Sequence, residues 1–180
     1  MTVAVRACGS DELGASVLAQ LVDLFRAAWP DGDFSEEDNA HAFGGRHFLA
    51  EVDGRVVSHA CVVPRTLWLH GRPLQTGYVE AVATLPRFRR QGLATRLMRM
   101  ANDHIAAGYE LGALSTGEHP LYERVGWQRW AGATWVREPD GTLTRTEDDD
   151  DGVMVLPTIR TPALTLREIL ACEWRPGDVW

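Results

Sequence analysis

The segment 78–95 constrains the fold of this chain more than any other. It reads as an apolar strand at 78–84, then a basic loop, and then a helix that begins at Leu93. Free backbone N–H groups and the dipole of a helix N-terminus make a binding site for an anion. Gly92 allows close approach to the backbone, and the small Ala94 leaves room for a bulky diphosphate. A solvated basic loop would have the same composition, so the loop alone is a weak signal.

The pattern around this segment predicts an α+β fold, with a central mixed and mostly antiparallel twisted sheet flanked by helices. Strand-like runs at 47–52, 56–69 and 74–84 are separated by turn sequences and indicate an antiparallel meander. Apolar residues recur at helical spacing over 13–29, with Ser10 as the expected cap, and over 93–108. The other expected elements are a strand at 2–7, a short helix capped by Ser35, a buried strand at 111–115, a short helix at 118–124, an antiparallel pair at 127–130 and 133–137, a strand at 153–156 and a helix at 164–171.

Length and composition favour one globular domain, 1–180. The chain has 180 residues, of which 45% are hydrophobic and 24% charged, which is enough to bury a sizeable core. No apolar run approaches the roughly 20 residues that span a bilayer, and the N-terminus lacks a signal-peptide pattern. The three cysteines of the chain are far apart in the sequence, which favours the reduced cytoplasm and buried thiols.

The balance of charge limits the partners that we expect. The formal net charge is −7, which argues against nucleic acid as a ligand. Clustered carboxylates would suit a cationic substrate, although solubility alone explains the charge equally well. The six histidines show no ligand spacing, so we expect no metal; His119 is a weak candidate for a proton relay beside Tyr122.

The loop resembles a known cofactor motif. Arg89-x-x-Gly92-x-Ala94 follows a strand and is similar to the Arg/Gln-x-x-Gly-x-Gly/Ala signature of the GNAT superfamily of N-acetyltransferases. In that family the loop binds the pyrophosphate of acetyl-coenzyme A, and the preceding strand pairs with the pantetheine arm. The resemblance therefore implies acetyl-coenzyme A as cofactor. It assigns cofactor binding to Val82, Ala83, Thr84, Arg89, Arg90, Gln91, Gly92, Leu93, Ala94 and Thr95.

A wider resemblance covers almost the whole chain. Segments 77–80, 111–115, 121–122, 126–127 and 172–180, with the acidic run before Gly152, are similar to aminoglycoside 2'-N-acetyltransferases. This implies direct acetylation of an aminoglycoside amine, resistance to the drug, and a homodimer. Segment 116–120 is shorter than in that group and 158–166 is unlike it, so the drug, of deoxystreptamine type or kasugamycin-like, stays open.

Two side chains carry the expected chemistry. Glu80 is an unusual charge in an apolar strand, and the resemblance favours a general base that acts through water. The alternative is a strand carboxylate paired with an arginine. Tyr122 matches the tyrosine that protonates the departing thiolate in GNAT enzymes, and its pKa near 10 suits a sulfur of similar basicity. The alternative is a core aromatic.

Acidic side chains would hold the ammonium groups of the substrate. Taken alone, each is better explained as a solvated charge, but together with the resemblance they predict one acidic cleft. The residues that we expect to bind substrate are Asp33, Asp38, Glu80, Ser115, Asp149, Asp150, Asp178 and the terminal carboxylate of Trp180. Two rival hypotheses are a GNAT enzyme acting on a polyamine or peptide amine, and a module that binds cofactor or drug without turnover.

Overall fold

The computed structural model describes residues 2–30 and 35–180. They form two compact units, Met1–Val63 with Val79–Ala101 and Pro64–Tyr78 with Asn102–Trp180. Three elements continue along the chain from one unit into the other, namely β3 (Arg55–Leu69), β4 (Arg72–Thr84) and α3 (Leu93–Gly108). The expectation of a single domain over 1–180 stays a prediction.

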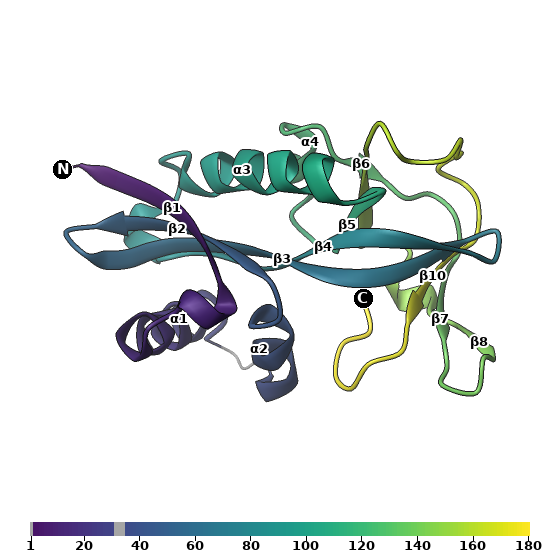
Figure 1. The fold of residues 1–180 in the computed structure, drawn as a ribbon, viewed down its shortest axis with the longest axis horizontal. Coiled ribbons are helices and arrows are strands. Elements are labelled where there is room, and N and C mark those ends of the chain that lie inside the picture. The colour runs from purple at the N-terminus through teal and green to yellow at the C-terminus, as the bar shows by residue number, and fades with distance from the viewer. Residues whose placement is uncertain (1, 31–34) are drawn as a thin grey trace. The chain divides into compact units, whose positions relative to one another are not determined.

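The first unit is a set of antiparallel strands between helices. Strand β2 (Arg46–Val52) pairs with β1 (Val3–Gly9) on one side and with β3 on the other. The β2–β3 turn places Asp53 and Gly54 at φ 48° and 76°, the left-handed pair that a tight hairpin requires. Helices α1 (Ala15–Ala28) and α2 (Glu36–Ala42) lie on one face of these strands and α3 on the other (Figure 1).

The two helix starts predicted in this unit have different outcomes. Ser35 caps α2 as expected, since its Oγ accepts from the Asp38 amide at 3.1 Å and Asp38 accepts from the Ser35 amide at 2.9 Å. The prediction for Ser10 is wrong: residues Ser10–Glu12 form a 3₁₀ turn, η1, and α1 begins only at Ala15. The Ser10 hydroxyl is engaged elsewhere, with the Gly45 carbonyl and the His47 ring.

The second unit contains the remaining strands, which belong to a mixed sheet. Its strands follow the order β6-β9-β5-β4-β3-β10-β7-β8. Strand β5 runs parallel to β4, and β7 parallel to β10, whereas β9 is antiparallel to both β5 and β6. The bounds of these elements are β5 (Leu111–Ser115), α4 (His119–Glu123), β6 (Gln128–Arg129), β7 (Thr134–Arg137), β8 (Leu143–Arg145), β9 (Val153–Pro157) and β10 (Leu170–Glu173). The predicted α+β class and mixed sheet are confirmed.

Two predictions fail in this unit, and pairing across the sheet explains both. Segments 127–130 and 133–137 do not pair with each other, because β6 pairs with β9 and β7 lies between β8 and β10. The helix expected at 164–171 is absent. Leu170 and Ala171 instead begin β10, buried between β3 and β7, so tertiary pairing overrides the local helical pattern. Within 2–30 and 35–180, no helix is long and apolar enough to cross a membrane.

Candidate active site

The strand that precedes the basic loop is distorted at one residue. Ala81 of β4 has a φ of 50°, a left-handed conformation that costs a residue with a Cβ about 1 kcal/mol or more. Its carbonyl oxygen lies 2.7 Å from Nδ1 of His59 on β3. The ladder between β4 and β5 covers Thr76–Tyr78 in the second unit. Ala81 lies in the first unit, directly after Glu80 and before the residues predicted to bind the cofactor.

The basic loop has the geometry of an anion site. After the short 3₁₀ turn η2 (Pro86–Phe88), both Arg90 and Gly92 are left-handed, with φ of 60° and 77°. The Arg96 amide donates to the Gly92 carbonyl at 3.0 Å, so the first turn of α3 starts there. Amides of a first helical turn have no acceptor within the helix and can bind an anion.

The side chains around the loop carry positive charge and line a pocket. Arg89 donates through Nε to the Thr84 carbonyl at 3.2 Å, which links the loop to the end of β4. A pocket of about 540 Å³ adjoins the loop and is lined by Val52, Asp53, Arg55, Val57, Arg87, Phe88 and Gln91. All the residues predicted to bind cofactor thus lie together in the first unit.

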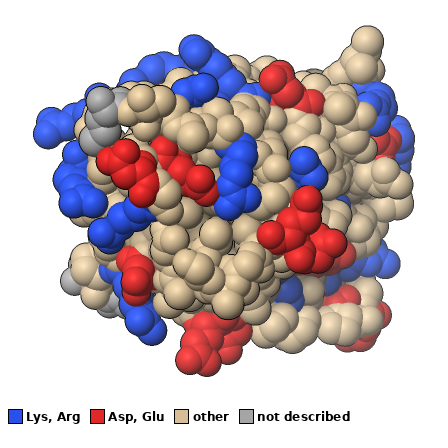
Figure 2. All heavy atoms as spheres, turned by 60° about the vertical axis from the view of Figure 1, so that its left-hand side comes forward, with Lys and Arg blue, Asp and Glu red and all other residues tan. Residues whose placement is uncertain are grey.

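Positive charge is not concentrated into one large patch on the face drawn in Figure 2. There, basic side chains lie mainly along the upper and left margins, and clusters of carboxylates lie between them. Every one of the 18 basic residues is an arginine, which can bind a phosphate with two parallel hydrogen bonds. The charges on this face are therefore mixed.

Ser58 on β3 bonds to the end of β4, and no sequence signal marked it. Its hydroxyl donates to the Ala83 carbonyl at 3.0 Å and lies 2.7 Å from Oγ1 of Thr84. Ser58 is fully buried, so these contacts are protected from water. Two consecutive side chains of β3, Ser58 and His59, therefore contact the backbone of β4 at alternate carbonyls.

A buried cluster that contacts Ala81 through His59 was also missed from the sequence. The ligand atoms of His47, His59 and Cys61 lie within 4.8 Å of one another, and all three residues are buried. The two imidazoles contact each other, with His47 Nδ1 2.9 Å from His59 Nε2. Burial lowers the pKa of His47 to about 4 and of His59 to about 3. Because these nitrogens already share a hydrogen bond, the cluster reads as a polar network; the expectation of no metal stays untested.

Glu80 is half-buried in β4, in the first unit. Its charge affects Cys61: burial is the largest cause of the raised pKa of the Cys61 thiol, and the Glu80 carboxylate is the second. A charged carboxylate between the apolar Val79 and the strained Ala81 suits a base that takes a proton from a bound amine. The role of Glu80 remains a prediction.

Tyr122 lies in the second unit, on α4, with 6% of its surface exposed. Burial raises the pKa of its phenol to about 12, and a hydrogen bond with Thr116 partly offsets the shift. Its ring meets Trp127 edge to face, with centroids 6.3 Å apart. Tyr122 is therefore a packed aromatic whose phenol keeps its proton at neutral pH. Its pKa lies above the value near 10 expected from the sequence, and its role as a proton donor stays a prediction.

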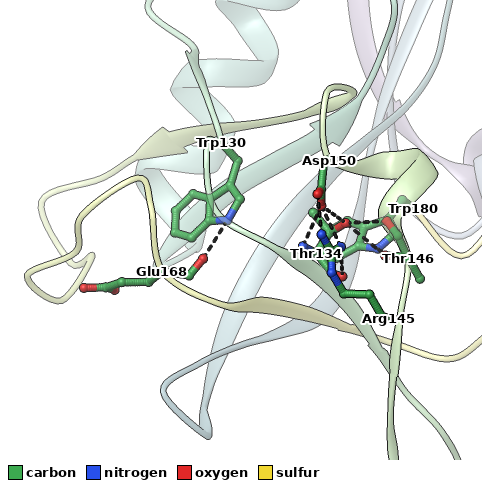
Figure 3. A network of polar contacts seen from close by, with 7 residues as sticks. All are labelled: Trp130, Thr134, Arg145, Thr146, Asp150, Glu168 and Trp180. Carbon is green, nitrogen blue, oxygen red and sulfur yellow. Dashed lines mark hydrogen bonds and ion pairs between the residues drawn. The ribbon is translucent and has the colours of Figure 1, made fainter.

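Four of the predicted substrate residues come together in the second unit. The Trp180 amide donates to Asp178 at 3.1 Å. Burial, and then the charge of Asp178, raise the pKa of Asp149 to about 6. Asp150 adjoins them but already accepts from the amide and hydroxyl of Thr134 and from Arg145, as Figure 3 shows. Burial and neighbouring negative charge thus disfavour the ionised form of Asp149.

The other predicted residues are spread over both units. Asp38 is in the first unit, where its carboxylate completes the cap of α2. Ser115 ends β5 in the second unit and pairs with Val153, and Asp33 lies outside the described residues. His119 contacts the Asp151 carbonyl at 2.7 Å. Glu80 and Tyr122 lie in different units.

Comparison with known proteins agrees with this geometry. The chain matches the model of the acetyltransferase (GNAT) domain over residues 11–130. It belongs to the GNAT family of acetyltransferases. It is 43% identical over 155 residues to an aminoglycoside 2'-N-acetyltransferase from Mycolicibacterium fortuitum, a match that covers 83% of this chain and 78% of the relative.

Solved structures show the same fold. A GNAT-family N-acetyltransferase (YhbS) from Escherichia coli in complex with CoA has a TM-score of 0.66 at 17% identity, covering 94% of this chain and 89% of that one. A GNAT-family acetyltransferase from Brucella melitensis in complex with acetyl-CoA has a TM-score of 0.60 at 18% identity, over 94% and 95%. The chain spans about a third of the length of several longer matched structures.

Proposed function

We propose that this chain is an acetyl-coenzyme A-dependent aminoglycoside 2'-N-acetyltransferase that confers resistance to its substrate. The observation that carries the proposal is the 43% identity to the Mycolicibacterium fortuitum enzyme over 83% of this chain. The anion site at the start of α3 and the distorted strand before it support the cofactor assignment. The whole of 1–180 then acts as one domain, in the cytoplasm and as a homodimer.

The first unit has the groups that a coenzyme A molecule needs. The left-handed Gly92 exposes the first turn of α3, and a Cβ built on it would meet no atom within 4 Å, so the space before the helix is open to a pyrophosphate. Amides of Leu93, Ala94 and Thr95, with Arg89, Arg90 and Gln91, would hold that group. The backbone of Val82, Ala83 and Thr84 would pair with the pantetheine arm. When bound, the cofactor supplies an activated acetyl thioester.

The proposed chemistry is direct transfer without a covalent enzyme intermediate. Glu80 accepts the proton of the substrate amine through a water molecule, which leaves the nitrogen lone pair free to attack. A backbone N–H near Val82 would donate a hydrogen bond to the carbonyl oxygen of the bound thioester. Tyr122 keeps its proton at neutral pH because its pKa is about 12. Its phenol would give that proton to the sulfur of the leaving coenzyme A, and the second proton of the amine, released as the amide forms, would return to the phenol.

We place the aminoglycoside against the acidic residues. Asp149, Asp178 and Trp180 would bind ammonium and hydroxyl groups, together with Asp38, Ser115 and Asp33. Asp150 contributes chiefly by anchoring Thr134, because Arg145 already neutralises its charge. Acetylation removes one positive charge from the drug, which weakens its attraction to anionic RNA.

The experiment that tests the proposal is acetyl-coenzyme A consumption with a panel of aminoglycosides, including deoxystreptamine drugs and kasugamycin, with mapping of the acetylated position. Acetylation of the 2'-amine is the expected result. Turnover of polyamines or peptides alone would replace the substrate assignment while keeping the reaction. Tight cofactor binding without any acetylated product would favour a binding module instead. Light scattering in solution tests the homodimer separately.

A further inference from the structure

We propose that Ser10, His47 and His59 form a buried hydrogen-bonded chain that positions the backbone of β4 at Ala81, and that His59 is thereby a positioning residue for Glu80 and the cofactor strand. The inference deepens the proposed function and rests on it, because it concerns how the cofactor strand and the base are held. Its three side chains take no other part in the proposed chemistry.

The chain of contacts is continuous through the first unit. Ser10 Oγ lies 2.9 Å from His47 Nε2, His47 Nδ1 lies 2.9 Å from His59 Nε2, and His59 Nδ1 lies 2.7 Å from the Ala81 carbonyl oxygen. Both imidazoles are fully buried. The register explains the alignment, because His47 on β2 is directly opposite Cys61 on β3, and residues two apart on a strand share a face.

Neighbouring groups seal the two rings. Phe25 of α1 meets His59 at 5.1 Å between ring centroids, and Phe43 meets His47 at 5.8 Å. Cys61, the other titratable group in the cluster, donates its thiol to the Ala42 carbonyl at 3.0 Å, and burial raises its pKa. Glu80 is close enough for its charge to contribute to that shift. Burial also lowers the pKa of each imidazole, so both rings are neutral at neutral pH.

Neutral rings leave one arrangement of protons that completes the chain. A carbonyl oxygen only accepts, so His59 must carry its hydrogen on Nδ1 to bind Ala81. His59 Nε2 is then an acceptor and requires a hydrogen on Nδ1 of His47. His47 Nε2 accepts in turn from the Ser10 hydroxyl. The Ala81 carbonyl therefore fixes the tautomer of both histidines, and the one proton of the Ser10 hydroxyl is shared between His47 Nε2 at 2.9 Å and the Gly45 carbonyl at 3.0 Å.

The end of the chain coincides with the strained residue. A residue with a Cβ stays at positive φ only where its surroundings stabilise that conformation, and Ala81 has a φ of 50°. The His59 hydrogen bond supplies a fixed partner for the carbonyl of this residue. Glu80 is the immediate neighbour of Ala81, so the same bond also fixes the direction in which the Glu80 side chain projects from β4. Ser58 holds the Ala83 carbonyl in the same way.

Two substitutions at His59 separate positioning from packing. The side-chain amide nitrogen of Asn corresponds to Nδ1 of His, and that of Gln corresponds to Nε2. His59→Asn should therefore retain the bond to Ala81 and most of kcat/KM, whereas His59→Gln should lower kcat/KM about 10- to 100-fold. Packing alone predicts the reverse order, because Gln is closer in volume to His. The exposed His70 is the matched control, and neither His70→Asn nor His70→Gln should change the rate.

Readouts on the cofactor-free and cofactor-bound protein keep this test separate from the test of the proposed function. ¹⁵N NMR of the wild-type imidazoles should show Nδ1–H tautomers for His47 and His59 at neutral pH, even if no aminoglycoside is a substrate. Calorimetry with acetyl-coenzyme A should show weaker binding for His59→Gln than for His59→Asn. An Nε2–H tautomer at His59, or equal cofactor affinity and rate in folded Asn and Gln variants, would overturn the proposal.

Discussion

The indole Nε1 of Trp180 donates to Oγ1 of Thr146 at 3.0 Å, and that hydroxyl donates onward to Thr134 at 2.9 Å. Thr134 completes the series by donating to the Asp150 carboxylate at 2.8 Å. Figure 3 shows these residues; the Thr134 hydroxyl also lies 2.7 Å from the Thr146 carbonyl. Trp180 is therefore linked to the acidic segment by a continuous series of hydrogen bonds.

We expect Trp180→Ala to destabilise the protein strongly. Only 3% of the Trp180 surface is exposed, and replacing a buried aromatic with alanine costs about 3–5 kcal/mol. Urea denaturation measures the change in free energy of unfolding. Trp174 is 47% exposed, so Trp174→Ala is the control and should change stability by less than about 1 kcal/mol. Similar losses for both variants would contradict the packing of Trp180.

We expect Gly92→Leu to weaken acetyl-coenzyme A binding about tenfold or more, because about 1.4 kcal/mol of strain or lost contact corresponds to that factor. Gly92 has a φ of 77°, which any side chain disfavours, and a side chain there would enter the open space before α3. Calorimetry gives the affinity directly. Gly108, at the other end of α3, also has open space around it but lacks a positive φ, and Gly108→Ala should bind cofactor normally. Unchanged affinity in Gly92→Leu would remove the pyrophosphate assignment.

Tyr122→Phe should lower kcat while leaving the affinity for acetyl-coenzyme A nearly unchanged, since it removes a proton donor and keeps the packed ring. The pKa of about 12 also predicts that Tyr122 causes no loss of rate between neutral pH and about pH 10. Steady-state kinetics across this range, with Tyr109→Phe as control, measures both effects. If kcat and cofactor affinity fall together, Tyr122 is a packing residue only.

Asp149 should make stability fall as pH rises. Its pKa is raised in the folded state from 3.8 to about 6, so the native protein binds the proton more tightly than the unfolded chain does. The stabilisation is complete below pH 3.8 and is lost as the pH passes about 6. Asp149 is half-exposed, and solvent screening limits the effect to about 1 kcal/mol.

Asp149→Asn should consequently be the more stable protein at neutral pH by no more than about 1 kcal/mol, and should lose this advantage toward pH 3.8. The same variant should raise KM for a polycationic substrate, because the ionised carboxylate is missing. Denaturation at several pH values and kinetics measure the two effects. Asp103→Asn, at an exposed site on α3, should show neither. A variant that gains no stability would contradict the crowding of charge around Asp149.

Strong local patterns predicted their elements well. The bounds of α3 and β5 agree with the predicted 93–108 and 111–115, because each has a clear apolar pattern that Gly or a polar turn ends. The loop before α3 was predictable as a loop for the same reason, because a glycine and arginines precede a periodic helix; its role in cofactor binding stays a prediction. The family resemblance supplied the reaction, which no periodicity contains.

Features that depend on strand register were not predictable. His47 and Cys61 are 14 positions apart in the sequence, and only the β2–β3 register puts them opposite each other. The strand at 170–173 carries a helical pattern and becomes a strand because β3 and β7 offer partners on both sides. Ser10 looked like a helix cap because the sequence does not reveal that a histidine of β2 engages its hydroxyl.

The three cysteines make the proposed reaction convenient to follow. Cys8, Cys61 and Cys172 are free thiols with at most 4% of their surface exposed. Burial raises the pKa of Cys61, and raises that of Cys172 to about 11, so few thiolates are available to react. Coenzyme A released by acetyl transfer carries an accessible thiol. A chromogenic disulfide reagent should therefore report each turnover as it happens, against little background from the folded protein.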